Sequence, residues 1–317
     1  MQVGEPTSTS GAGPERIDPL APAVAGRYED AVVTVTRRDG VRLRAAPGTV
    51  RTPHFDVTSR DGRVLVSHVV PVAAVDDDLT GLLGEELFEP GWLRGADLFE
   101  RVFTGVVRTS AADPLGAWQL FYANTLTRLE SAGTERGSGS HASAPGSIAA
   151  YAPVHQHAMD LLRAGSVLEL GCCFGFLALR IARTGRAVTA SEASPRTVGL
   201  LAAVAPRLGV RLRTVTADAA RFPAPNGIVD TVLAVHLLEH LEPEHGRRVV
   251  AEALRLARRR VVIAVPLEDE ADETYGHLRT VSLGDLRRWG RGTRLRFDVH
   301  EHHGGWLVLD KPPARSA

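Results

Sequence analysis

The stretch Val167-Leu168-Glu169-Leu170-Gly171-Cys172-Cys173-Phe174-Gly175 decides the fold. An apolar run that ends in small residues is typical of a buried strand that turns sharply into a helix, because glycine lets the backbone turn and approach a ligand closely. The helix that follows presents backbone N–H groups at its N-terminus. A glycine-rich turn of this kind is weak evidence for a particular fold by itself, so the segments before and after it must be considered as well.

Downstream of this turn, short apolar runs alternate with segments of helical periodicity. We expect strands at 166–170, 187–191, 213–217, 231–235 and 260–266, with helices at 176–184, 195–208 and 245–256. An antiparallel strand is expected at 306–309. The βαβα order predicts an α/β fold with a doubly wound, mostly parallel sheet over residues 147–317.

The first half of the chain follows a different pattern. Residues 1–26 are rich in Gly, Pro, Ser and Ala and are expected to be a disordered tail. Residues 27–133 are expected to form an α+β region that caps the substrate, with strands at 31–36 and 63–72 and helices at 79–88, 96–107 and 114–129, the last capped by Asp113. Residues 134–146 read as a flexible linker.

The overall composition excludes several classes of protein. The 317 residues contain 37 Lys+Arg and 37 Asp+Glu, a balance that argues against a general nucleic-acid or anionic-membrane binder. The only cysteines are the adjacent Cys172 and Cys173, which favours a reducing compartment without a disulfide framework. No apolar run approaches the roughly 20 residues of a spanning helix, so we expect a cytoplasmic protein.

Polar residues follow each of the next expected strands. In an open α/β sheet, ligands bind at the carboxyl ends of the strands. Glu192 lies about 20 residues past the glycine turn, where an acid accepts hydrogen bonds from ribose hydroxyls. Asp218-Ala219 follows the third strand, where a carboxylate can accept from an adenine amino group, and His236-Leu237-Leu238-Glu239-His240 follows the fourth.

These four pieces, in this order, resemble the class I S-adenosylmethionine (SAM)-dependent methyltransferases over about residues 147–310. The resemblance implies a seven-stranded Rossmann-like sheet whose last strand is antiparallel. It also implies that Glu169, Gly171 and Gly175 shape the methionine pocket, that Glu192 holds the ribose, and that Asp218 with Ala219 holds the adenine. We add Cys173, within the turn, and His236, after the fourth strand, as candidate cofactor-binding residues. A dinucleotide dehydrogenase is the alternative, but the Asp218 and Leu238-Glu239-His240 elements have no place in it.

Cys173 is the one departure from the glycine pattern. It stands where the middle glycine of the turn is usual. If this position needs a positive φ, a side chain there costs about 1–2 kcal/mol.

The turn after the fourth strand has two interpretations. His236, Glu239 and His240 fall at i, i+3 and i+4, one face of a helical turn, and a fourth metal-binding side chain is His277. This set is similar to the metal-dependent methyltransferases that modify the 2′-hydroxyl of small RNAs, and its imidazoles favour Mn²⁺, Fe²⁺ or Zn²⁺ over Mg²⁺. Alternatively, His236 lines the SAM pocket while Glu239 and His240 cap and pack the next turn.

Either interpretation makes His236, Glu239, His240 and His277 the candidate catalytic residues. An alcohol must lose its proton before it accepts a methyl group, and a general base or a metal ion can bring this about. The set therefore favours O-methylation. His236, Glu239 and His240 also match the inverted zinc-peptidase pattern H-x-x-E-H. We reject that interpretation, because the peptidase motif lies inside a long helix and this one follows a strand.

A narrower resemblance is carried by residues 90–93, 99–107, 168–176, 235–241 and 301–306. These segments are similar to the mycofactocin oligosaccharide methyltransferases. The resemblance implies methylation of a glucose hydroxyl on the oligoglucose chain of a peptide-derived redox cofactor, which would be the partner. A methyltransferase for RNA or another small metabolite, and a SAM-binding regulatory protein without catalysis, stay open as alternatives.

Two further features are ambiguous. The run His300-Glu301-His302-His303 resembles a metal cluster, but alternate residues of a strand point to opposite faces, so we favour a hairpin. Aromatic residues of the N-terminal helices would either face sugar rings or form the core of those helices: Trp92, Phe99, Phe103, Trp118 and Tyr122.

Overall fold

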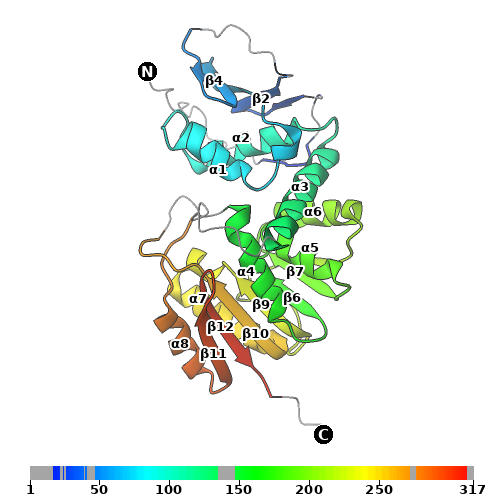
Figure 1. Ribbon diagram of the computed structural model, residues 1–317, viewed down its shortest axis with the longest axis vertical. Helices are drawn as coiled ribbons and strands as arrows, with labels where there is room; N and C mark the ends of the chain where they lie inside the picture. The colour runs from blue at the N-terminus through cyan, green and yellow to red at the C-terminus, as the bar shows by residue number, and fades with distance from the viewer. Residues whose placement is uncertain are drawn as a thin grey trace. The chain divides into compact units, whose positions relative to one another are not determined.

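The computed structural model describes residues 17–21, 24, 26–38, 40, 47–134, 147–271 and 276–312 (Figure 1). The predicted tail up to residue 16 and the predicted linker from residue 135 lie outside the described residues. Contacts between Cα atoms divide the chain into two compact units. The described residues up to Arg128, with 147 and 148, form the first unit, and the remainder form the second.

The first unit contains a five-stranded sheet in the order β1-β2-β5-β4-β3. The strands are β1 (Arg27–Glu29), β2 (Val33–Arg37), β3 (Val50–Arg51), β4 (Phe55–Arg60) and β5 (Arg63–His68). β2 and β5 are parallel, whereas the other pairs are antiparallel. The expected strands at 31–36 and 63–72 correspond to β2 and β5. β1 and β3 are too short, and β4 too polar, for a sequence pattern to detect.

Three helices follow this sheet in the chain. α1 (Leu79–Leu83) continues into a π-helical turn (Gly84–Phe88), and α2 (Ala96–Arg108) and α3 (Pro114–Thr134) follow. α2 packs on β1 and β2. Asp113 Oδ1 accepts from Gly116 N at 2.8 Å, which confirms the predicted cap. A Cβ on Gly105 would lie 2.3 Å from Val35 Cγ2, so only glycine lets α2 approach β2 this closely.

The aromatic residues of these helices are mostly core. Phe103, Trp118 and Tyr122 are buried, and Phe103 and Trp118 pack edge-on against Phe121 with ring centroids 5.6 and 5.5 Å apart. The sugar-platform interpretation is therefore wrong for Phe103, Trp118 and Tyr122, since their faces are covered by other side chains. Trp92 and Phe99 are half-buried.

Residues 17–21 correct the expectation of disorder for the whole tail. Trp118 Nε1 and Arg108 Nη1 donate to the Pro19 carbonyl at 2.8 and 2.9 Å, and Arg108 also donates to the Ala21 carbonyl. Ile17 is buried. Buried donors on α2 and α3 need acceptors, and this tertiary requirement cannot be read from composition.

The second unit contains the seven-stranded sheet, in the order β11-β12-β10-β9-β6-β7-β8. Its strands are β6 (Val167–Leu170), β7 (Val188–Glu192), β8 (Arg213–Thr216), β9 (Val229–Val235), β10 (Ala257–Val265), β11 (Arg296–Glu301) and β12 (Gly305–Asp310). β12 is antiparallel to both of its neighbours, while β6 to β10 run parallel. The predicted doubly wound sheet with an antiparallel last strand is confirmed.

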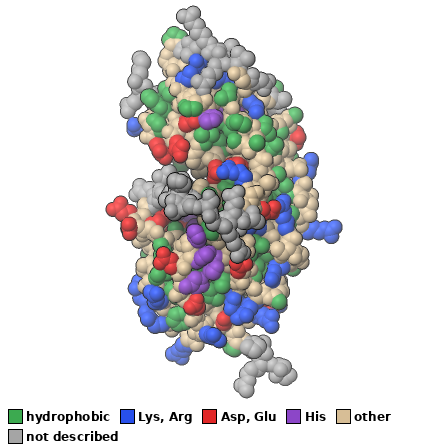
Figure 2. All heavy atoms as spheres, viewed as in Figure 1, with side chains coloured by type: hydrophobic (Ala, Val, Ile, Leu, Met, Phe, Trp, Pro, Cys, Tyr) green, Lys and Arg blue, Asp and Glu red, His purple; other side chains and the backbone are tan. Residues whose placement is uncertain are grey.

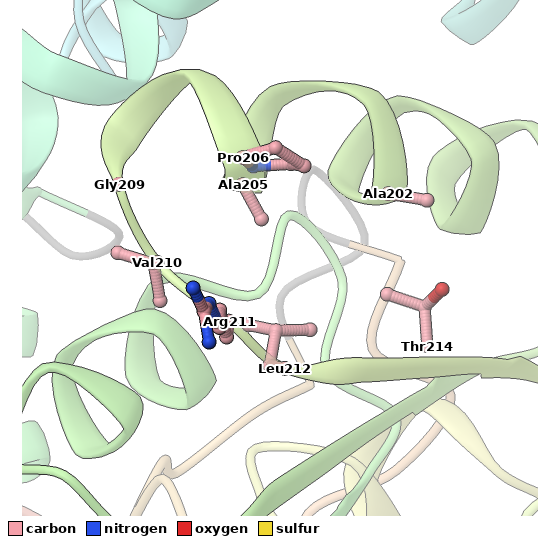
Figure 3. A pocket seen from close by; sticks show the side chains of 8 residues that line it. All are labelled: Ala202, Ala205, Pro206, Gly209, Val210, Arg211, Leu212 and Thr214. Atoms are coloured by element: carbon pink, nitrogen blue, oxygen red, sulfur yellow. The ribbon is translucent and has the colours of Figure 1, made fainter.

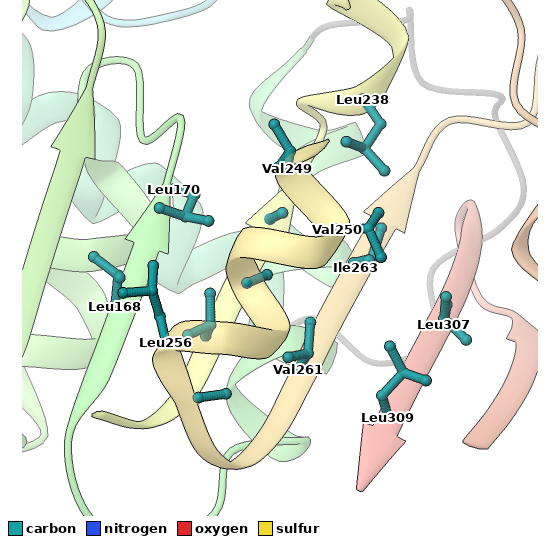
Figure 4. Packing of buried hydrophobic residues seen from close by; sticks show 14 of the residues in the cluster. Leu168, Leu170, Leu238, Val249, Val250, Leu256, Val261, Ile263, Leu307 and Leu309 are labelled. Atoms are coloured by element: carbon teal, nitrogen blue, oxygen red, sulfur yellow. The ribbon is translucent and has the colours of Figure 1, made fainter. Parts of the chain in front are cut away.

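The helices of this unit are α4 (Ile148–Asp160), α5 (Phe176–Arg183), α6 (Pro195–Val204), α7 (Pro243–Leu256) and α8 (Leu283–Gly292). Figure 4 shows α7 laid against the strands, with Val249, Val250 and Leu256 in the same buried core as Ile263 of β10. α8 was not predicted, although Ser282 and Asp285 form a capping box at its start. Among the described residues, no helix has both the length and the apolar character to cross a membrane.

Candidate functional site

The turn between β6 and α5 has a left-handed backbone and is tightly packed by leucine side chains. Gly171, Cys173 and Gly175 have φ of +69°, +49° and +78°. A Cβ on Gly171 would lie 2.6 Å from Leu237 Cδ1, and one on Gly175 2.5 Å from Leu201 Cδ2. Cys173 therefore does occupy a left-handed conformation, at the cost foreseen from the sequence.

Glu192, at the end of β7, lies beside this turn. Its Oε2 accepts from Cys173 N at 3.1 Å, and its Oε1 accepts from Ala193 N at 2.6 Å. β7 is the parallel neighbour of β6, which explains why an acid 19 residues away in sequence meets the glycine turn. The structure thus brings the predicted ribose acid to the predicted methionine turn.

Asp218 follows β8, the next strand along the same edge. Its Oδ1 accepts from Ala220 N at 2.8 Å and pairs with His245 Nε2 at 2.8 Å. The Asp218 side chain is 52% exposed, so a ligand can still reach it, and Ala219 is half-buried. The sequence did not predict His245 as its partner, because His245 lies on α7.

Glu169 is enclosed within the sheet. It is 4% exposed, and burial raises the pKa of its carboxyl to about 8 despite the N–H of Ala178. Its Oε2 has no hydrogen-bond partner among the described residues. Glu169 therefore carries a proton at neutral pH, and a ligand with a polar group can satisfy its second oxygen.

The exit of β9 is the second part of the site. His236 has a φ of +49°, and its backbone N donates to the Ala264 carbonyl at 2.9 Å. A single 3₁₀ turn, Leu238–His240, follows. Glu239 is 1% exposed, burial raises the pKa of its carboxyl to about 8, and neither oxygen has a hydrogen-bond partner in the described part of the chain.

Glu239, His240 and His277 form a compact group. Their potential ligand atoms all lie within 4.8 Å of one another, and the two imidazole centroids are 4.8 Å apart. Leu278 N donates to the Glu239 carbonyl at 2.9 Å, which fixes the later loop against the 3₁₀ turn. Residues that are 37 positions apart in sequence thus share one site.

The Nδ1 atoms of His240 and His277 both lie near hydrogen-bond acceptors. His240 Nδ1 lies 3.2 Å from the Gly276 carbonyl, and His277 Nδ1 lies 2.8 Å from Glu268 Oε2. With hydrogen on Nδ1, each Nε2 carries the lone pair that a metal ion requires, and such partners are characteristic of metal-binding histidines. The pairing of Glu268 with His277 was not predicted from the sequence.

His236 stands apart from this group. Its Nδ1 lies 3.9 Å from Glu239 Oε1, and its ring lies 5.4 Å from that of Tyr151 on α4. Burial lowers the pKa of His236 to about 4, so the ring is neutral at physiological pH. The structure brings together three of the four residues proposed as ligands and places His236 at their edge.

α4 contributes side chains that the sequence analysis missed. Tyr151 lies between His236 and His155, with the centroid of the His155 ring 6.2 Å from its own. His155 is buried, and burial lowers its pKa to about 3. No sequence signal marked these residues, because α4 resembles an ordinary core helix.

A cavity of about 460 Å³ lies elsewhere, between α6 and β8 (Figure 3). It is lined by Ala202, Ala205, Pro206, Gly209, Val210, Arg211, Leu212 and Thr214. The lining has no acid or imidazole and shares no residue with the site above. It is not a candidate for the chemistry.

Comparison with known proteins supports a SAM-dependent methyltransferase domain. Residues 167–260 match a family model described as a methyltransferase domain, which covers β6 to the start of β10. No curated protein matches the chain.

Similar solved structures include magnesium protoporphyrin IX methyltransferase from Synechocystis PCC 6803 with bound SAM. It is 19% identical, covering 59% of this chain and 90% of that one, with a TM-score of 0.41. A SAM-dependent methyltransferase from Aquifex aeolicus is 15% identical, covering 49% and 85%, with a TM-score of 0.40. The assignment rests on the family match.

Proposed function

We propose that this chain is a SAM-dependent O-methyltransferase acting on a sugar hydroxyl, with a glucose unit of the mycofactocin oligosaccharide as substrate. The methyltransferase-domain match is the starting point. The observation that carries the proposal further is the group Glu239, His240 and His277, whose buried carboxyl group has no hydrogen-bond partner among the described residues.

The residues at the ends of β6, β7 and β8 fit SAM, which supplies the methyl group. Gly171 and Gly175 have positive φ and leave no room for a Cβ beside Leu237 and Leu201, and the backbone of this turn would lie against the methionine part of SAM. Glu192 would hold the ribose and Asp218 the adenine. Leu237 packs on the turn at Gly171, so the exit of β9 lies next to the methionine end.

The group Glu239, His240 and His277 fits a divalent ion. One carboxylate and two imidazoles are ligands suited to Mn²⁺, Fe²⁺ or Zn²⁺. Such an ion would supply Lewis-acid stabilisation of an ionised hydroxyl. Glu268 and the Gly276 carbonyl hold the two rings in place for it.

A sugar acceptor fits this chemistry. Glucose carries vicinal hydroxyls, and a pair of adjacent oxygens can chelate one ion. The oligosaccharide itself is suggested by the resemblance of the motif segments, among which Cys172-Cys173-Phe174-Gly175 is the most specific.

Chelation and replacement of the ion test this proposal. After exhaustive EDTA treatment, methyl transfer to an oligoglucose acceptor should stop and should return with Mn²⁺, Fe²⁺ or Zn²⁺. His277→Ala should abolish turnover while leaving SAM affinity unchanged, and His303→Ala, an exposed histidine in the β11–β12 turn, should match the wild type in both. Full activity after chelation would contradict a metal and leave general-base catalysis by His236, His240 or His277.

A further inference from the structure

We propose that His157 and His300 form a second divalent-metal site, made of imidazoles, that ties α4 to the β11–β12 hairpin. His157 lies on α4 and His300 on β11, and their Nε2 atoms are 2.7 Å apart. This site is separate from Glu239, His240 and His277 and does not depend on the proposed methyl transfer.

The orientation of His300 is fixed by a carboxylate. His300 Nδ1 lies 2.6 Å from Asp298 Oδ2, so Nδ1 donates its hydrogen to the acid. Nε2 then carries a lone pair that faces His157. An Asp behind an imidazole is the usual outer partner of a metal-binding histidine.

A hydrogen on His157 Nε2, donated to the lone pair of His300 Nε2, accounts for this distance in the neutral pair. A divalent ion would take the place of that hydrogen, with His157 carrying its own hydrogen on Nδ1 instead. Zinc binds imidazole nitrogen at about 2.0–2.1 Å, so two nitrogens of a tetrahedral site are about 3.3 Å apart. The observed 2.7 Å is several tenths of an ångström shorter, a difference that side-chain rotation can supply.

His302 and Trp306 lie beside the His157–His300 pair. The His302 ring centroid lies 4.3 Å from that of His157. Trp306 meets His157 edge-on at 4.7 Å, and its Nε1 donates to the His302 carbonyl at 2.8 Å. Trp306 thereby holds the backbone of the turn, and solvent would supply the remaining ligands of an ion bound by His157 and His300.

The site is open to solvent. The His300 side chain is 29% exposed, and His302 is exposed. Figure 2 shows histidine side chains gathered over the region where Figure 1 places α4 and the β11–β12 hairpin. A site built from imidazoles suits Zn²⁺, Ni²⁺ or Cu²⁺ and not Mg²⁺ or Ca²⁺.

Calorimetric titration of the metal-free full-length protein with Zn²⁺ tests the inference. The His277→Ala protein, in which the first site is broken, should still bind one Zn²⁺. Adding His157→Ala or His300→Ala should weaken that binding at least tenfold, and adding His303→Ala should leave it unchanged. Asp298→Asn, a milder change at an exposed residue, should weaken it about ten- to hundredfold.

The thermal midpoint gives a second readout. Zn²⁺ should raise the midpoint of the His277→Ala protein, because a ligand that binds only the folded state stabilises it, and should not raise it once His300 is also replaced. Wild-type protein that binds one Zn²⁺, lost with His300→Ala but not with His277→Ala, would support this site while contradicting the ion proposed for catalysis. Absence of saturable binding to the His277→Ala protein, or binding unaffected by His157→Ala and His300→Ala, would overturn the inference.

Discussion

The acidic side chains at the carboxyl edge of the large sheet differ in their hydrogen bonding between two halves of that edge. In the half formed by β7 and β8, Glu192 and Asp218 accept hydrogen bonds from nearby backbone N–H groups. In the half formed by β9, Glu239 is buried and, within the described residues, its oxygens accept none. The acids of the first half have hydrogen-bond donors within the described chain, whereas the buried carboxyl of Glu239 has none there.

Under the proposed function, this difference would separate cofactor binding from the methyl-transfer chemistry. A carboxylate held by backbone donors is well ordered and can exchange some of those donors for ribose or adenine groups. A buried carboxyl without partners costs free energy in the folded protein, and such sites are commonly functional. The comparison predicts that changes in the two halves will affect different measurements.

The largest effect is expected from Glu239→Gln. Loss of this ligand should reduce methyl transfer at least about 100-fold, since even outer partners of metal ligands are worth about 10–100-fold. SAM affinity, measured by calorimetry, should stay within twofold of the wild type. Glu242→Gln, at an exposed acid three residues on, is the control and should retain activity. Loss of SAM binding in Glu239→Gln would contradict the claim that Glu239 acts in methyl transfer and not in cofactor binding.

Glu192→Ala should give the converse result. SAM and its demethylated product should bind at least about tenfold more weakly, equivalent to about 1.4 kcal/mol. Glu192→Gln keeps the shape and one acceptor oxygen and should lose less. Unchanged affinity in Glu192→Ala would remove this residue from the cofactor site.

A third effect concerns pH and stability. The pKa of Glu169 is raised to about 8 in the folded protein from an ordinary value of 4.5, so between these values the folded state holds a proton that the unfolded state has released. Unfolding free energy from this group should therefore fall with rising pH across that window, by up to about 1.4 kcal/mol per pH unit. Glu169→Gln should lose this contribution, which urea unfolding at pH 6 and pH 8 would measure. An identical pH dependence in both proteins would show that Glu169 is ionised when buried.

The smallest effect is expected at the turn itself. Cys173→Gly removes the side chain from a left-handed conformation, worth about 1–2 kcal/mol, but glycine returns part of this as unfolded-state entropy. The net gain in unfolding free energy should be about 1 kcal/mol or less. Cys173→Ala keeps the Cβ and should show no gain. A Cys173→Gly protein that is clearly less stable would mean that the thiol makes a stabilising contact.

The sequence predicted the second unit more completely than the first. The central strands β6, β9 and β10 contain apolar runs followed by turn residues, so their position and type follow from the sequence pattern. β1 and β3 are only 3 and 2 residues long, and their existence depends on partners elsewhere in the chain. The same holds for residues 17–21, which are ordered by donors on α2 and α3.

The site shows the same limit. Glu239 and His240 were found from their spacing, and His277 from its residue type. The pairing of Glu268 with His277, of His245 with Asp218, and of His157 with His300 joins residues from separate elements. A sequence pattern can predict which nearby residues share one face of an element. These contacts join residues far apart in the chain and depend on how the strands are ordered in the sheet.

The most direct test of the central claim is mass spectrometry of the acceptor. The protein would be incubated with SAM bearing a deuterated methyl group and the mycofactocin oligosaccharide, with RNA and small metabolites in parallel. We predict that the label appears on a glucose hydroxyl of the oligosaccharide and on neither of the other acceptors. Label on RNA or a metabolite instead would contradict the sugar substrate, and SAM binding without label on any acceptor would contradict catalysis altogether.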